Sequence, residues 1–136
     1  MIHQELLYLA LYTLFTACMW VPYIINRIME MGLWLALKNP QVEQPPKALW
    51  ARRAQRAHLN SIENLVIFAP LAVAIDLLKL SSSLSVSLCM LFFVVRILHY
   101  FSYVFAIPLV RTVLFFSGFL VQVFLAFIIV RTLWLG

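Results

Sequence analysis

Apolar residues dominate four long stretches of this chain, and short polar or proline-containing segments separate them. A helix needs about 20 predominantly apolar residues to cross a bilayer, and each stretch reaches that length. The pattern predicts helices over about residues 5–37, 48–78, 84–105 and 109–133. Because the connections between them are short, the helices are expected to run up and down in one bundle.

Residues that disfavour helix mark the breaks. The first connection, residues 38–47, is rich in proline and charge, and the second contains Lys79 and the serines at 81–83. Pro108 marks the third connection. Pro22 lies inside the first predicted helix and is expected to kink it, since proline lacks the backbone N–H that a helix uses.

Composition places these helices in a membrane. The chain has 136 residues, of which 65% are hydrophobic and 11% are charged, whereas a soluble domain carries about 25% charged residues. We therefore expect an all-α integral membrane protein with a single domain over residues 1–136. The net charge of +5 does not indicate a nucleic-acid partner, because no soluble basic domain is available to grip a duplex.

Basic residues gather on one side of the predicted bundle, which sets its expected orientation. Cytoplasmic loops of membrane proteins are enriched in lysine and arginine. Most basic residues of this chain lie at or near the first and third connections. These connections are therefore expected in the cytoplasm, and both termini outside. A short chain without a targeting extension fits a bacterial inner membrane better than the endoplasmic reticulum. The basic residues on the cytoplasmic side are Lys38, Lys47, Arg52, Arg53, Arg56 and Arg111.

The second helix has a polar face at its cytoplasmic end. At about 100° per residue, its polar side chains fall within a narrow arc. Ionisable groups in a membrane helix are costly and usually mark a site. Arginines suit carboxylates and a glutamate suits an amine, so this face predicts a pocket for a small zwitterionic or anionic ligand. Its members are Arg52, Arg53, Arg56, Asn60 and Glu63.

The other helices place polar groups at a similar depth. Arg96, His99 and Tyr103 share one face of the third helix, because they are three and seven residues apart. Arg111 and Thr112 open the last helix at the same level.

Arg27 lies near the inner end of the first helix. All the helices therefore contribute to one polar layer.

Other interpretations of these residues stay open. Arg52 and Arg53 can act as topology signals only, and Arg56 with Glu63 can form a structural ion pair. The group on the third helix can be an interhelical hydrogen-bond cluster. A haem-binding bundle that uses His58 and His99 is a further hypothesis, although His58 lies away from the polar face.

Two segments resemble a known family. Residues 56–64 (RAHLNSIEN) closely resemble the helix-2 signature of microsomal glutathione transferases, and residues 96–103 (RILHYFSY) resemble the corresponding helix-3 motif. The chain thus resembles the MAPEG family, the membrane-associated proteins in eicosanoid and glutathione metabolism. Its nearest likeness is to microsomal glutathione transferase and prostaglandin E synthase-like members.

The resemblance implies a homotrimer of four-helix subunits that binds glutathione between neighbours, in the cytoplasmic half of the membrane. Arg111 resembles the arginine that stabilises the glutathione thiolate, with Thr112 beside it as a hydroxyl donor. The implied glutathione-binding residues are Arg27, Arg52, Arg53, Arg56, Asn60, Glu63, Arg96, His99 and Tyr103.

The implied activity is that of a membrane glutathione transferase that can also act as a glutathione peroxidase. Its thiolate would attack a lipophilic electrophile or lipid hydroperoxide that arrives through the membrane lipid. Glutathione would be the cosubstrate, and no metal is implied. The alternative is a non-catalytic membrane protein of the same fold that binds lipid or glutathione.

Overall fold

The computed structural model describes residues 3–38 and 45–135. The described chain is all-helical, with α1 (Gln4–Cys18), α2 (Trp20–Met31), α3 (Leu33–Leu37), α4 (Leu49–Leu77), α5 (Ser83–Val104) and α6 (Pro108–Leu135). Within it, four segments are long and apolar enough to cross a membrane: α1 with α2, then α4, α5 and α6. The predicted four-span, all-α fold is confirmed.

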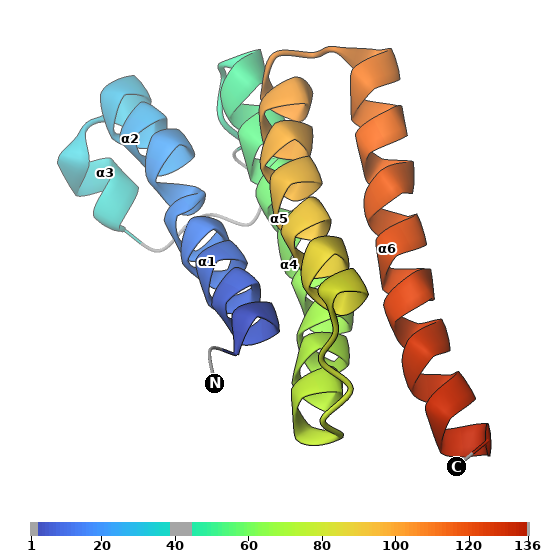
Figure 1. The fold of residues 1–136 in the computed structure, drawn as a ribbon. Coiled ribbons are helices and arrows are strands. Elements are labelled where there is room, and N and C mark those ends of the chain that lie inside the picture. The colour runs from blue at the N-terminus through green and yellow to red at the C-terminus, as the bar shows by residue number, and fades with distance from the viewer. Residues whose placement is uncertain (1–2, 39–44, 136) are drawn as a thin grey trace.

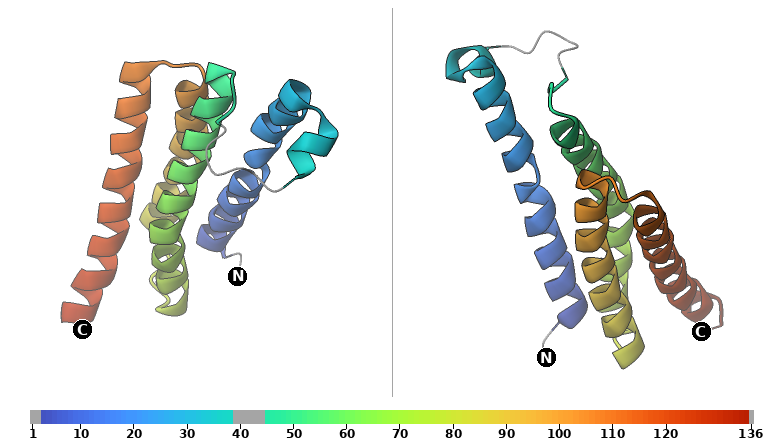
Figure 2. Two further views of the ribbon diagram at one scale, coloured as in Figure 1. Left: turned by 180° about the vertical axis from the view of Figure 1, so that it is seen from behind. Right: turned by 90° about the horizontal axis from the view of Figure 1, so that it is seen from above.

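Helices α4 and α5 lie side by side at the centre of the bundle, with α1 and α2 on one flank and α6 on the other (Figures 1 and 2). Aromatic rings hold the centre together. Phe68 of α4 stacks on Phe92 of α5 with ring centroids 4.0 Å apart, and Tyr12 of α1 meets Phe92 edge-on at 5.3 Å. All three side chains are fully buried, so this packing fixes the spacing of three helices.

The first span is interrupted near Pro22, as the sequence predicts. Helix α1 ends at Cys18, whose carbonyl would otherwise accept the hydrogen bond from the missing N–H of Pro22. The backbone N–H of Met19 instead donates to the Thr16 carbonyl at 3.2 Å. The chain then resumes as α2, which stays roughly in line with α1 (Figure 1).

The predicted continuation of the first helix to residue 37 is wrong. Helix α2 ends at Met31, and Gly32 adopts φ +82°, a conformation open to glycine and strained for other residues. The short helix α3 therefore folds back beside α2 instead of extending it (Figure 1). The first span thus does not project as one long helix beyond the membrane. Most of the predicted first connection, residues 39–44, lies outside the described residues.

A glutamate joins the end of the first span to the start of the second. Glu30 accepts hydrogen bonds from the backbone N–H groups of Lys47 and Ala48, each at 2.9 Å. Ala48 is the N-cap of α4, and its N–H is one of the donors that a helix N-terminus leaves without an internal partner; a carboxylate there also complements the helix dipole. Glu30 therefore fixes where α4 begins.

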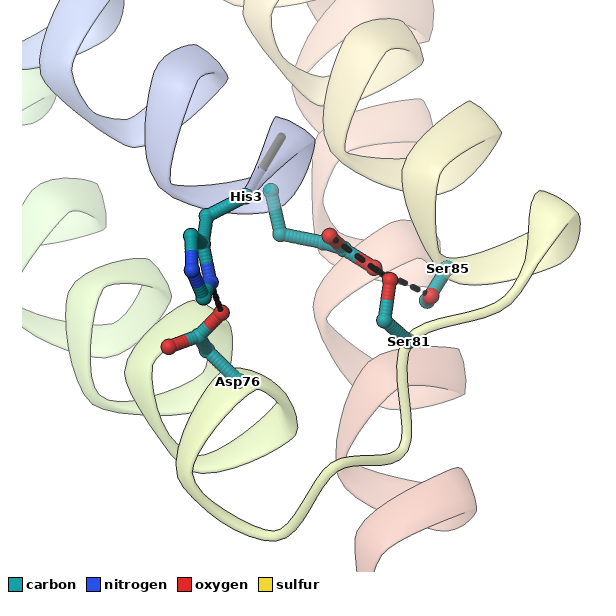
Figure 3. Close-up of polar contacts among 5 residues, drawn as sticks. His3, Asp76, Ser81 and Ser85 are labelled. Carbon is teal, nitrogen blue, oxygen red and sulfur yellow. Dashed lines mark hydrogen bonds and ion pairs between the residues drawn. The ribbon is translucent and has the colours of Figure 1, made fainter. Parts of the chain in front are cut away.

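A buried glutamate lies at the opposite end of the bundle, next to the four residues that are labelled in Figure 3. Glu5 of α1 is fully buried and accepts hydrogen bonds from the hydroxyls of Ser85, at 2.6 Å, and Ser81, at 2.8 Å. Beside it, His3 contacts the carboxylate of Asp76. These contacts attach the first turn of α1 to the connection between α4 and α5.

Candidate functional site

Arg96 lies in the interior of the bundle. Its side chain is fully buried, and its Nη2 donates to the side-chain oxygen of Asn60 at 2.7 Å. Its Nε donates to the hydroxyl of Tyr12 at 3.3 Å, and that hydroxyl donates to the Ser61 carbonyl at 3.0 Å. Arg96 therefore joins α5 to α4 and α1, and Tyr12 and Ser61 are members of this network that the sequence analysis did not single out.

This network leaves positive charge without an opposite partner. The Nη1 atom of Arg96 is buried and has no hydrogen-bond partner among the described residues. No carboxylate contacts the guanidinium in that part of the chain. Burying a charge is costly unless it is paired, so the hydrogen bonds to Asn60 and Tyr12 are what hold Arg96 in place.

Gly118 of α6 makes room for Arg96. A Cβ atom added at Gly118 would lie 3.4 Å from Cδ of Arg96 and 3.8 Å from Val95. A small residue here lets α6 approach α5 closely, as small residues do between membrane helices. The sequence analysis did not single out Gly118, because it lies in the middle of a long apolar run.

A second group brings α5 and α6 together near their connection. The rings of His99 and Tyr103 meet edge-on with centroids 5.8 Å apart, and the guanidinium carbon of Arg111 lies 4.8 Å from the Tyr103 ring centroid. This distance is typical of a cation–π interaction. The ring of Phe115 also contacts His99, with centroids 6.1 Å apart. Arg111 is therefore held at the start of α6 and stays partly exposed.

The hydroxyl of Thr112 makes its hydrogen bond within α6 and not with His99, Tyr103 or Arg111. Its side chain is exposed, and its Oγ1 donates to the Pro108 carbonyl one turn earlier at 3.0 Å. The Nδ1 atom of His99 is buried without a hydrogen-bond partner among the described residues, so the imidazole still has a polar atom to offer.

The outer face of α4 forms a third group. Arg52 and Arg56, one turn apart, line a hollow of about 360 Å³ together with Pro45, Gln55 and Leu59. Both arginines are exposed, and Nε of Arg52 donates to the Pro46 carbonyl.

Arg53 turns the other way and donates to the Val104 carbonyl at 2.8 Å. The neighbouring arginines of α4 thus point to different places: Arg52 and Arg56 line the hollow, and Arg53 binds the end of α5.

Glu63 is exposed on α4 and makes no ion pair with Arg56 in the part of the chain that the structure describes. The structural ion pair considered from the sequence is therefore not formed within the chain. Arg27 is half-buried on α2. His58 is engaged by the Tyr23 hydroxyl, 2.9 Å from its Nδ1.

The histidines do not form a common site. His58 has Tyr23 as its neighbour, whereas His99 contacts Tyr103 and Phe115. Across residues 3–38 and 45–135, no group of three or more His, Cys, Asp or Glu side chains is placed to hold a metal ion.

All three groups of predicted residues come from the first half of α4, the second half of α5 and the start of α6, which are the parts of these helices nearest the α5–α6 connection. The structure brings together Asn60 with Arg96, Tyr103 with His99 and Arg111, and Arg52 with Arg56. The hollow lined by Arg52 and Arg56 includes none of the residues of the other two groups.

The arrangement suits an anion. The guanidinium groups of Arg56, Arg96 and Arg111 have no carboxylate partner among the described residues. Such groups bind carboxylates through paired, charge-assisted hydrogen bonds.

Comparison of the sequence with known proteins identifies the family of the chain. The sequence model of the MAPEG family matches residues 6–131, which include all four candidate spans except a few terminal residues. No curated protein and no solved structure matches the chain. The match extends over nearly the whole length, so the chain belongs to the MAPEG family.

Proposed function

We propose that this protein is a membrane glutathione transferase that can also reduce peroxides with glutathione. The observation that supports this most is the position of Arg111. Its guanidinium is fixed against Tyr103 at the start of α6, beside the buried His99, and has no carboxylate partner in the described chain. Membership of a family that includes glutathione transferases supports this reaction class.

Glutathione offers two carboxylates, one amino group and one thiol. We propose that Arg52, Arg53 and Arg56 attract the carboxylates and that Glu63, which is exposed, receives the amino group. Asn60 is held by Arg96, so Arg96 acts on the ligand through Asn60.

Tyr103 and His99 form the wall next to the thiol. In a homotrimer, groups that are separate within one chain would meet at the boundary between neighbours, where Arg27 of α2 also contributes.

Arg111 would act on the thiol. A free thiol has a pKa of about 8.5 and is a poor nucleophile while protonated. A guanidinium nearby stabilises the thiolate, and the proton leaves to water. The sulfur then attacks a lipophilic electrophile from the bilayer and expels its leaving group. With a lipid hydroperoxide, attack on the O–O bond releases the alcohol, and a second glutathione completes the disulfide and releases water.

A conjugation assay tests this proposal. Purified protein with glutathione should show thiolate absorbance and should conjugate a model aryl halide. Arg111→Ala should lose the absorbance and slow conjugation about 100-fold or more, the range seen when one charge-stabilising donor is removed. Lys79→Ala, at the opposite end of the bundle, is the control of equal charge change and should keep full activity. Unchanged conjugation in Arg111→Ala would refute its role.

One observation favours a second candidate, a non-catalytic protein that binds lipid or glutathione. The Thr112 hydroxyl is engaged with the Pro108 carbonyl, and Phe115 offers no hydroxyl. Arg111 would then be the sole described group at the start of α6 that can act on a thiol. Saturable glutathione binding without turnover over a panel of aryl halides, enones and hydroperoxides would support this candidate.

A further inference from the structure

A large groove lies between α5 and α6, at the end of the bundle opposite to the three polar groups. Its volume is about 720 Å³, within the range of about 300–1,000 Å³ that small-molecule sites occupy. Here α5 begins and α6 ends, and α6 diverges from α5 toward the C-terminus (Figure 1). The apolar wall includes Leu84 and Leu88 of α5 with Phe124, Phe127 and Ile128 of α6.

The apolar part of the groove fits within one leaflet of a bilayer. Its wall on α6 extends over residues 124–135. At 1.5 Å per residue, the part of this wall between residue 124 and Arg131 is about 10 Å long, which is shorter than half of the roughly 30 Å hydrocarbon thickness. The groove therefore accommodates an acyl chain that enters from one face of the membrane.

A single charge lies in the last turns of this wall, one helical turn before Leu135. Arg131 is the one charged residue that lines the groove, it is exposed, and it makes no hydrogen bond or ion pair within the described chain. The neighbouring Thr132 hydroxyl already donates to the Ile128 carbonyl at 2.9 Å. An arginine near the end of a span extends toward the headgroups. The groove thus combines an acyl-sized apolar slot with a cation at headgroup level.

Apolar contact alone cannot select an occupant here. Lipid tails are as apolar as leucine, so moving a tail from the bilayer into the groove gains little. Selection must come from the headgroup, and the exposed guanidinium favours a phosphate without a compensating cation. We propose that this groove is a binding site for an anionic phospholipid of the phosphatidylglycerol class, with its phosphate on Arg131 and one tail between α5 and α6.

A second copy of the chain fits the groove less well. A helix packed there would cover Arg131 and would need to supply a carboxylate. At this end of the bundle the described acidic side chains are Glu5 and Asp76, and both are already engaged, with Ser81 and Ser85 and with His3. A phospholipid brings its own negative charge.

Lipid titration followed by native mass spectrometry tests the proposal on the full-length protein in an uncharged detergent. Phosphatidylglycerol should bind saturably, with one tight site per chain and about a fivefold preference over phosphatidylcholine, the size expected for one arginine at a membrane surface. Arg131→Gln should abolish the preference. Lys79→Gln, which removes an equal charge at the same end but outside the groove, should keep it.

A groove variant tests the tail independently of the charge. Leu88→Trp should weaken binding of both phospholipids, and circular dichroism should show unchanged helix content. The proposal is wrong if the wild type binds both lipids equally, or if Lys79→Gln and Arg131→Gln lower the preference to the same extent. It is also wrong if Leu88→Trp changes the oligomeric state without affecting lipid binding, because the groove would then hold another copy. Glutathione takes no part in these measurements, so they are independent of the proposed enzyme activity.

Discussion

At the scale of single residues, the bundle contains a buried arginine whose charge no described carboxylate balances. Arg96 is fully enclosed and is held by the Asn60 side chain and the Tyr12 hydroxyl. Hydrogen bonds to a charged group are stronger than neutral ones. Asn60 is therefore both a structural partner of Arg96 and a candidate ligand contact, and its two roles can be separated.

Asn60→Ala removes the acceptor of Arg96 and leaves more of the guanidinium unpaired. We expect a loss of about 1.5–3 kcal/mol, the usual size for a hydrogen bond to a charged group. Asn60→Asp should keep or raise the stability, because a carboxylate then faces the arginine. Thermal unfolding in detergent measures both, and Gln55→Ala on the exposed face of α4 is the control. Equal midpoints for Asn60→Ala and wild type would show that this contact does not stabilise the fold.

At the scale of helices, the contact between α5 and α6 depends on a glycine. Gly118→Ala places a Cβ 3.4 Å from Arg96. We expect it to be tolerated, since the nearest atom belongs to a long side chain and alanine favours helix by up to about 1 kcal/mol. Gly118→Leu should cost about 1–3 kcal/mol through overpacking. Thermal midpoints of the two variants test this, and a stable Gly118→Leu would contradict the close approach.

The first turn of α1 depends on a buried carboxylate. Glu5→Ala removes the acceptor shared by Ser81 and Ser85. We expect a loss of about 1–3 kcal/mol, with faster amide exchange at the start of α1. Gln4→Ala, an exposed neighbour, should change neither quantity. Hydrogen exchange followed by mass spectrometry makes the comparison, and slow exchange in Glu5→Ala would show that apolar packing alone holds α1.

The four spans could be predicted from the sequence because a long apolar window is a local signal. The break at Gly32 could not, because residues 33–37 are apolar and continue the helical pattern; the turn depends on the positive φ of one glycine. Depth along each helix placed Asn60 and Arg96 in the same layer, and the structure shows them in contact. Glu5 was missed because its partners lie far along the chain.

At the scale of the whole molecule, the two ends of the bundle differ in chemistry. One half contains Arg52 and Arg56 of α4, Arg96 of α5 and Arg111 of α6, and the opposite end contains the apolar groove with Arg131. The proposed orientation places the arginine-rich half toward the cytoplasm, as the positive-inside rule expects. A water-soluble cosubstrate would then enter from the cytoplasm, and lipophilic partners would enter from the bilayer.

Cysteine labelling tests this orientation. Cys18 is exposed and is replaced by alanine, whereas Cys89 is fully buried and can stay as an internal control. In intact bacterial cells, an impermeant maleimide should label Ser83→Cys, at the α4–α5 connection. It should label Ile107→Cys, at the α5–α6 connection, only after the inner membrane is permeabilised. The reverse pattern would invert the topology.

We propose that the arginine-rich half of the bundle binds glutathione through the charged ends of the tripeptide. Isothermal titration calorimetry of the purified protein in detergent tests it most directly. We predict saturable heat with glutathione and with its analogue in which serine replaces cysteine, weaker binding in Arg56→Ala, and unchanged binding in Lys79→Ala. Absence of heat with both tripeptides in the wild-type protein would show that the arginine-rich half does not bind glutathione.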